Sequence, residues 1–416
     1  MKHIALLGHG VVGSGVHELF HKNRESINEK LGEEVIISKI LVRNLSKYSE
    51  EPEFKKFTDT FTSDFYADVD FVIEVMGSIS PAYEYVKKAL EAGKHVITAN
   101  KDLIAEKGEE LSKIATANNA VLNFEASVAG GIPIIKTVKE SLAGNTIDRI
   151  TAILNGTTNF ILSKMYEDDM DYDTALKLAQ EAGFAEANPT SDVMGYDAAR
   201  KLSILTRLAF DKVIPWKKIS IQGITGVDRR DIQFAKSQKY KIKLVATSFY
   251  NGSHIYATVQ PAFVHRSSVI GKIDNEFNTV VINGDAVGEI VFSGKGAGRL
   301  PTASAILGDL MDIIINKKKT SSGQLAEKCE MMNYWPFECN WFVRLKSKGD
   351  PISIDNIFNC FDQSEVQIKD LKDLTDVGFI VKAQDEKYIK DRVMDFLAHN
   401  TNLSIKYYKI FEDVMK

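Results

Sequence analysis

The chain has 416 residues, of which 44% are hydrophobic and 26% are charged, and its formal net charge is -4. A soluble chain of this length and composition is expected to form two or three domains. Because the charge is small and forms no basic or acidic block, we expect neither nucleic acid nor an anionic membrane as a partner. No apolar run approaches the roughly 20 residues that a membrane span needs, and the first residues lack a signal-peptide pattern.

All three cysteines lie in the last quarter of the chain, at Cys329, Cys339 and Cys360. Their spacing is not that of a metal site, and their odd number argues against a disulfide framework. We therefore expect a reducing, cytoplasmic environment.

A glycine-rich motif, residues 8–13, follows the first predicted strand, residues 3–7. Its GxGxxG spacing between a strand and a helix is the fingerprint of a dinucleotide-binding unit. The first glycine permits a tight turn, the second lets a pyrophosphate approach the backbone, and the third lets helix and strand pack closely. Free N–H groups at the helix start also favour phosphates. The residues predicted to contact the cofactor here are Gly8, Gly10, Val11, Val12 and Gly13.

The residue after the second predicted strand, residues 35–42, indicates which dinucleotide is preferred. NAD-specific sites usually carry Asp or Glu there for the ribose 2′-OH. This chain has Arg43 instead, whose forked guanidinium suits a 2′-phosphate. We therefore expect NADP, or use of both NADP and NAD; the alternative is that Arg43 is an ordinary surface residue.

Strand and helix patterns then alternate as far as residue 124, which predicts a doubly wound parallel sheet of the Rossmann type. Ligands of such sheets lie beyond the carboxyl ends of the strands. Lys101 follows the strand at residues 95–98 and is placed to meet a substrate carbonyl. The alternative, a surface lysine at a helix start, is less attractive because a cation there opposes the helix dipole.

Residues 125–133 are small and glycine-rich, as expected for a hinge that leaves the cofactor domain. Their carbonyls, with Glu125, are suited to a hard monovalent cation, although a plain linker fits the sequence as well. Residues 131–292 predict an α+β domain with a mixed or antiparallel sheet. Within it, residues 155–159 offer hydroxyl and N–H groups to a carboxylate, or form only a turn with a threonine cap.

The stretch 179–201 is unusually rich in charged residues. Asp197 and Lys201 are four residues apart and share one face of a predicted helix. Glu186, on the preceding loop, can fold back toward them. Two carboxylates beside an amine suit a small zwitterion with an ammonium group and a reactive oxygen. A surface salt bridge beside a solvated loop is the plainer alternative.

The last part of the chain divides in two. A glycine-rich loop at residues 293–304 opens a helix that reaches residue 315, which we expect to return to the cofactor domain and close the nicotinamide pocket. After a linker, residues 316–340, the order of elements over residues 341–416 is βαββαβ. The predicted domains are therefore residues 1–130 with 293–315, residues 131–292, and residues 341–416.

Four motifs together resemble the homoserine dehydrogenase family over residues 1–315: residues 8–13, 98–101, 154–159 and 183–201. The last matches the family signature almost residue for residue. The resemblance implies NAD(P)-dependent interconversion of L-aspartate 4-semialdehyde and L-homoserine, in threonine and methionine biosynthesis. It also implies that Lys101 and Lys201 are catalytic, without indicating which donates the proton.

The resemblance carries further residues onto this sequence. The resemblance implies that five residues bind the substrate: Gly156, Thr157, Glu186, Asp192 and Asp197. It implies that two of them, Glu186 and Asp197, hold the substrate ammonium and orient Lys201. Those implied to contact the cofactor, beyond the glycine loop and Arg43, are Thr98, Lys101 and Gly298. Those at positions that bind a sodium ion in the family are Glu125, Val128, Gly130 and Ile132.

Two other functions fit the sequence less well. An aspartate semialdehyde dehydrogenase needs a cysteine nucleophile, and no cysteine precedes Cys329. A non-catalytic NADP-responsive regulator would have lost its lysines, and both are present.

The C-terminal βαββαβ order resembles an ACT domain, which often senses threonine in this family. Ile352 follows Asp350-Pro351 where such domains usually have glycine, which argues against effector binding and favours a role mainly in assembly. Threonine as an effector stays an open alternative. The resemblance implies a homodimer or homotetramer, and we expect a monofunctional enzyme.

Overall fold

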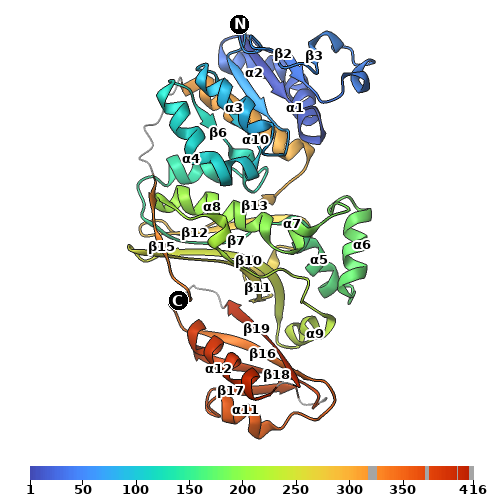
Figure 1. Cartoon of the computed structure of the whole chain (residues 1–416), viewed down its shortest axis with the longest axis vertical. Helices are drawn as coiled ribbons and strands as arrows, with labels where there is room; N and C mark the ends of the chain where they lie inside the picture. Colours follow the sequence, from blue (N-terminus) through green and yellow to red (C-terminus); the bar gives the residue numbers. More distant parts are fainter. Residues whose placement is uncertain (317–325, 371–373, 401, 412–416) are drawn as a thin grey trace. The chain divides into compact units, whose positions relative to one another are not determined.

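The computed structural model describes residues 1–316, 326–370, 374–400 and 402–411 (Figure 1). It divides into two compact units, each made of segments that are distant in sequence. The first unit consists of Met1–Asp148, Ala199–Ile219 and Asn278–Cys329. The second consists of Arg149–Ala198, Ser220–Phe277 and Glu330–Lys416. The three-domain division made from the sequence stays a prediction, and residues 317–325 of its linker lie outside the described residues.

A six-stranded parallel sheet forms the centre of the first unit, in the order β3-β2-β1-β4-β5-β6. This is the Rossmann strand order, so the fold predicted for this part is confirmed. The strands are β1 (Lys2–Leu7), β2 (Val35–Leu41), β3 (Phe57–Thr58), β4 (Phe71–Glu74), β5 (His95–Thr98) and β6 (Leu122–Asn123).

Helices of the first unit bury apolar faces against this sheet. They are α1 (Val11–Lys22), α2 (Arg24–Leu31), α3 (Ala82–Glu91), α4 (Lys101–Ala117) and, far along the chain, α10 (Arg299–Asn316). In α10, Ala303, Ile306, Leu310 and Ile313 recur at helical spacing and share one core with Ile4 of β1. The helix predicted to return after residue 293 is therefore α10, and it lies in this core (Figure 1).

The second unit contains a mixed sheet whose strands follow the order β7-β10-β11-β19-β16-β18-β17. Its long strands are β7 (Ile147–Ile153), β10 (Tyr240–Tyr250) and β11 (His254–His265), paired antiparallel. Its helices are α5 (Gly156–Glu167), α6 (Tyr172–Glu181), α7 (Thr190–Val193) and α9 (Arg229–Ser237). Three further elements cross the unit boundary or belong to the first unit: α8 (Tyr196–Phe210), β12 (Phe277–Gly284) and β13 (Gly288–Lys295).

The C-terminal elements have the βαββαβ order expected from the sequence. They are β16 (Cys339–Ser347), α11 (Ile354–Cys360), β17 (Val366–Asp370), β18 (Asp376–Gln384), α12 (Glu386–His399) and β19 (Leu403–Phe411). They have their own core, which includes Trp341, Phe379 and Ile389. The sequence did not indicate that β19 also pairs with β11, in parallel register, so that this segment continues the sheet of the second unit.

A π-helical turn, Thr137–Ser141, follows the hinge predicted at residues 125–133. Two local predictions differ from the structure. The last strand of the alternating pattern, expected to reach residue 124, is reduced to β6. Residues 155–159 form no turn, because α5 begins at Gly156 with Asn155, not a threonine, as its cap. No helix among the described residues is long and apolar enough to cross a membrane.

Candidate functional site

The glycine loop between β1 and α1 leaves room for an anion at the start of α1. Gly8 has φ +103°, and a Cβ there would lie 3.0 Å from the carbonyl oxygen of Val75. A Cβ on Gly13 would lie 2.2 Å from the carbonyl oxygen of Gly8, so both positions require glycine. Gly10 caps α1, whose first turn receives no side-chain cap, and a Cβ there would meet nothing within 4 Å. The loop thus fits a dinucleotide pyrophosphate.

Other predicted cofactor residues lie at the edges of this loop. Val11 is 70% exposed and Val12 is half-buried, both at the start of α1. Arg43 is exposed two residues after β2 ends, at the position from which a ribose substituent is read in this fold. Gly298, with φ +120°, immediately precedes α10.

A buried polar network joins the carboxyl ends of β4 and β5. Glu74 is fully buried, and it accepts hydrogen bonds from the Thr98 hydroxyl at 2.5 Å and the Met76 N–H at 2.7 Å. Burial raises the pKa of Glu74. The Thr98 oxygen also accepts the Asn100 N–H at 2.9 Å, and Asn100 caps α4. Thr98 therefore helps to hold the carboxyl ends of β4 and β5 together. Glu74 belongs to the same hydrogen-bond network, and the sequence did not indicate this role.

Lys101 and Lys201 lie on two helices of the first unit. Lys101 is the first residue of α4 and is half-buried, whereas Lys201 on α8 is only 9% exposed. Their neighbours form an ion pair, in which Arg200 Nε lies 3.1 Å from Asp102 Oδ1. The Arg200 guanidinium also lies 4.3 Å from the centre of the Trp216 ring. The plainer interpretation of residues 197–201 as a surface salt bridge is wrong, because Asp197 and Lys201 are both buried.

In the second unit, Asn155 holds two of the predicted carboxylates together. Its side-chain amide donates to Asp192 Oδ1 at 2.6 Å and to Asp197 Oδ2 at 2.8 Å. Its oxygen accepts the Thr158 N–H at 2.8 Å and so caps α5. Asp197 is 3% exposed. Two carboxylates held by one neutral amide form a negative group suited to an ammonium ion. Asn155 was part of a motif in the sequence, but its role as the link was missed.

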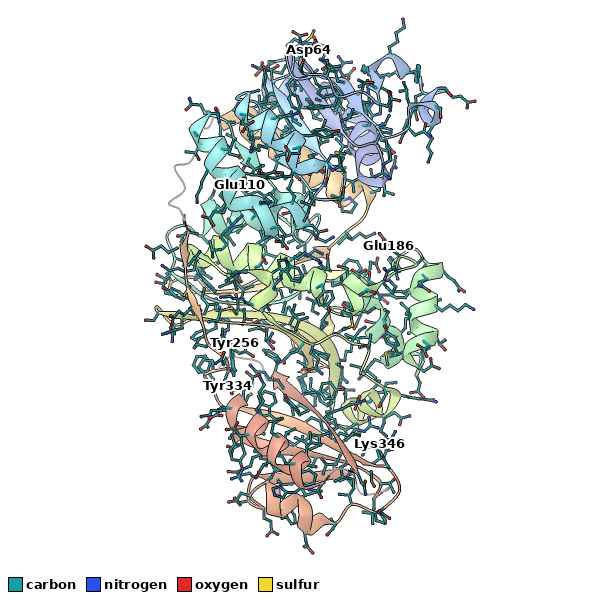
Figure 2. The ribbon with its side chains drawn as sticks, viewed as in Figure 1. Asp64, Glu110, Glu186, Tyr256, Tyr334 and Lys346 are labelled. Atoms are coloured by element: carbon teal, nitrogen blue, oxygen red, sulfur yellow. The ribbon has the colours of Figure 1, made fainter. Side chains whose placement is uncertain are left out.

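The other predicted substrate residues lie near this group in the second unit. The Thr157 hydroxyl donates to the Phe184 carbonyl at 2.5 Å, which fastens the loop after α6 to α5. A Cβ on Gly156 would lie 2.6 Å from the Glu276 carbonyl oxygen, so only glycine fits. Glu186 is exposed on the loop after α6 (Figure 2). There the Gln180 amide donates to the Glu186 backbone carbonyl at 3.2 Å.

The carboxylate of Glu125, predicted as part of a cation site, is used locally. It is buried and accepts the backbone N–H groups of Ile134, Ile135 and Lys136, each at 2.7 Å. Burial raises the pKa of Glu125. Its own N–H donates to Asp309 at 2.8 Å. The backbone carbonyls of Glu125 and Ile132 also accept hydrogen bonds, from the Val128 N–H at 3.3 Å and the Ile134 N–H at 2.9 Å.

The three remaining members of the predicted cation site lie in the same tightly packed loop. Val128 and Ile132 are buried, and Gly130 has φ +53°. A Cβ on Gly130 would lie 2.5 Å from the Gly296 backbone. The backbone therefore packs so closely at Gly130 that a side chain has no room there.

Two family models match the chain: "Homoserine dehydrogenase, NAD binding domain" over residues 8–125 and "Homoserine dehydrogenase" over residues 133–311. The homoserine dehydrogenase of Bacillus subtilis is 38% identical over 389 residues, 92% of this chain and 89% of that protein. The homoserine dehydrogenase of Lactococcus lactis is 39% identical over 326 residues, 77% of this chain and 76% of that protein.

Solved structures give the same result. A homoserine dehydrogenase from Thiobacillus denitrificans has a TM-score of 0.89 and 31% identity, covering 99% of this chain and 98% of its own. One from Staphylococcus aureus has a TM-score of 0.79 and 32% identity, covering 99% of both chains. A hyperthermophilic archaeal homoserine dehydrogenase in complex with NADPH has a TM-score of 0.65 and 26% identity, covering 77% of this chain and 100% of its own.

Proposed function

Since this chain belongs to the homoserine dehydrogenase family of NAD(P)-dependent oxidoreductases, we propose that Lys101 and Lys201 supply the proton chemistry of that reaction. The reaction interconverts the aldehyde of L-aspartate 4-semialdehyde and the alcohol of L-homoserine. When bound, the nicotinamide cofactor supplies or accepts the hydride.

The acidic group held by Asn155 binds the substrate ammonium. Asp192 and Asp197 accept from the same amide, so their negative charges stay close together and attract a cation. Glu186, exposed on a loop that Thr157 fastens, adds a third carboxylate when it turns inward. The observation that carries this assignment is that Lys201 follows Asp197 by about one turn of α8. One helix thus links ammonium binding to proton transfer.

The lysines act on the oxygen of the reacting carbon. As hydride reaches the aldehyde, negative charge develops on that oxygen, and a nearby ammonium stabilises and then protonates it. Burial of Lys201 strengthens this interaction, because charges attract more strongly where water is excluded. In the reverse direction, the neutral amine removes the hydroxyl proton of homoserine.

We propose NADP as the preferred cofactor, with Arg43 on the 2′-phosphate and the loop Gly8–Gly13 on the pyrophosphate. Support comes from the exposure of Arg43 and from the space above Gly10. We also propose a sodium ion on the backbone carbonyls of Glu125, Val128, Gly130 and Ile132. The Glu125 carboxylate keeps its three N–H partners in this arrangement and so holds the loop in place.

We propose that the C-terminal segment is an ACT-like domain that serves assembly into a homodimer or homotetramer. Its element order and its sheet order, β19-β16-β18-β17, support this proposal. Ile352 is buried, which agrees with a packing role at the position where an effector-binding turn usually has glycine.

The proposal is tested by homoserine oxidation at alkaline pH with NADP and with NAD, comparing the natural chain with Lys201→Ala. General acid–base catalysis of this kind contributes about 10²–10⁴-fold, so the variant should lose that factor in kcat while NADPH binding persists. Lys113→Ala, which removes an exposed lysine of α4, serves as the control. Near-normal turnover by Lys201→Ala would remove Lys201 from the catalytic role.

A further inference from the structure

The proposed function leaves unused a group of side chains in the first unit. His17 and His21 are four residues apart on α1 and therefore share one helix face. Glu53 lies in the segment between β2 and β3, and its Oε2 is 2.9 Å from Nε2 of both histidines. The possible ligand atoms of the three residues all lie within 4.8 Å of one another. Among the residues that the structure describes, no other group of three such side chains is this close.

We propose that His17, His21 and Glu53 bind a divalent transition-metal ion, with Zn²⁺ the best match. Two imidazole nitrogens and one carboxylate oxygen form a ligand set that zinc accepts, with water in the fourth position. A tetrahedral zinc with ligands at about 2.1 Å separates the ligand atoms by roughly 3.4 Å. Only small side-chain rotations are needed, and the side chains of His21 and Glu53 are 39% and 31% exposed, which leaves room for them.

His9, from the glycine loop, completes the arrangement as the outer partner of His17. Its Nε2 lies 3.1 Å from His17 Nδ1. Metal-bound histidines usually donate their second ring N–H to a carboxylate, a backbone carbonyl or water, which orients the ring. Here the His9 ring nitrogen takes the place of that acceptor. When an ion replaces the proton between His17 Nε2 and Glu53, the neutral His17 ring carries its one proton on Nδ1, donates it to His9 Nε2, and presents the Nε2 lone pair to the ion. The His9 ring is itself fixed by edge contacts with Tyr48 and Phe57, at centroid distances of 5.3 Å and 5.0 Å.

Lys56 is the group that opposes the ion, because its ammonium pairs with Glu53. It occupies the second carboxylate oxygen and repels a cation at short range. The proposal therefore predicts opposite changes in metal affinity for two kinds of substitution at this site. Loss of a histidine should weaken metal binding, and loss of the Lys56 ammonium should strengthen it.

The test is calorimetric titration of the full chain, stripped of metal by a chelator, with Zn²⁺. We expect one site whose Kd rises by about tenfold or more in His21→Ala, by about tenfold in His9→Asn, and falls in Lys56→Met. His254→Ala is the matched control, since His254 is an exposed histidine beside a single carboxylate, Glu330 at 3.6 Å. Circular dichroism checks that each variant folds.

Titration with Co²⁺ reports the ligand type, because cysteine thiolates give an intense charge-transfer band that imidazoles and carboxylates lack. We expect no such band. Equal Zn²⁺ affinity in the natural chain and His21→Ala would overturn the proposal, and so would a thiolate band that persists in His21→Ala.

Discussion

Arg200 and Asp102 form an ion pair that joins α8 to the first turn of α4, with Nε 3.1 Å from Oδ1. Each member is the sequence neighbour of a lysine assigned to proton chemistry, Lys201 and Lys101. Arg200 is further held against the face of Trp216. Within the first unit, this pair therefore fixes the two backbone segments from which the lysines project.

We expect Asp102→Asn to lower kcat by roughly tenfold, because a misplacement of about 1 Å at a reacting group has costs on this scale. The affinity for NADPH should change much less than kcat, since the glycine loop and Arg43, proposed to hold the pyrophosphate and the 2′-phosphate, lie on other elements. Steady-state kinetics and cofactor fluorescence measure the two quantities. Glu109→Gln removes another ion pair of α4, with the exposed Lys113, and is the control. If both variants behave alike, the Arg200 pair has no positioning role.

Asn155 has two separable functions, capping α5 and donating to Asp192 and Asp197. Asn155→Ser keeps a good helix cap and loses the amide that links the carboxylates. We expect its Tm to stay near that of the natural chain while KM for homoserine rises by about tenfold or more, as expected when charge-assisted hydrogen bonds are lost. Asn155→Ala should add a loss of about 1 kcal/mol in stability.

Asp171→Ala is the matched control for this prediction, because it removes the cap of the neighbouring helix α6. It should lower the Tm without changing KM. An unchanged KM in Asn155→Ser would mean that the carboxylates keep their arrangement without the amide.

The glycine loop, the Rossmann strands and the helix that carries Asp197 and Lys201 were predictable because their signals are local. The apolar run before Gly8 and the helical spacing after Asp197 each lie within a few residues. The link through Asn155 was not predictable, since its partners are 37 and 42 residues away and nothing in the spacing selects them. The pairing of β19 with β11 fails to show in the sequence for the same reason.

Two other features were missed for different physical reasons. Helix α9 has nine residues and opens with three charged ones, so its buried apolar residues, Ile232, Phe234 and Ala235, are too few to establish a helical period from the sequence. A capping box of Asp228 and Asp231 stabilises its start. Glu74 sits in an apolar strand where a carboxylate looks like a strand end. Its hydrogen bonds to Thr98 and Met76, which allow its burial, become visible only once the strands are side by side.

Arg43→Ala should weaken NADPH binding by about tenfold or more and NADH binding by less than twofold. The reason is that a charge-assisted hydrogen bond to the 2′-phosphate contributes on the order of 1.5–3 kcal/mol, and NADH lacks that group. Titration by cofactor fluorescence gives both constants. Lys30→Ala, an exposed cation on α2, controls for the general loss of positive charge. Equal weakening of both cofactors would disprove the assignment to the 2′-phosphate.

Asp309 makes the first unit sensitive to pH, because burial raises the pKa of this carboxyl to about 8 from an ordinary value of 3.8. Between these values the folded chain keeps a proton that the unfolded chain releases, so the contribution of Asp309 to stability falls as the pH rises from about 4 to 8. Asp309→Asn should remove this loss while its oxygen still accepts the Glu125 N–H. We expect its Tm relative to the natural chain to rise by several degrees between pH 5 and pH 8, since about 1 kcal/mol shifts Tm by ~2–4 °C in a domain of this size.

Asp59→Asn, on an exposed loop, is the control and should show a constant difference in Tm over the same pH range. A constant difference for Asp309→Asn as well would mean that Asp309 is already ionised in the folded chain, with the Glu125 N–H and the Lys139 ammonium stabilising its charge.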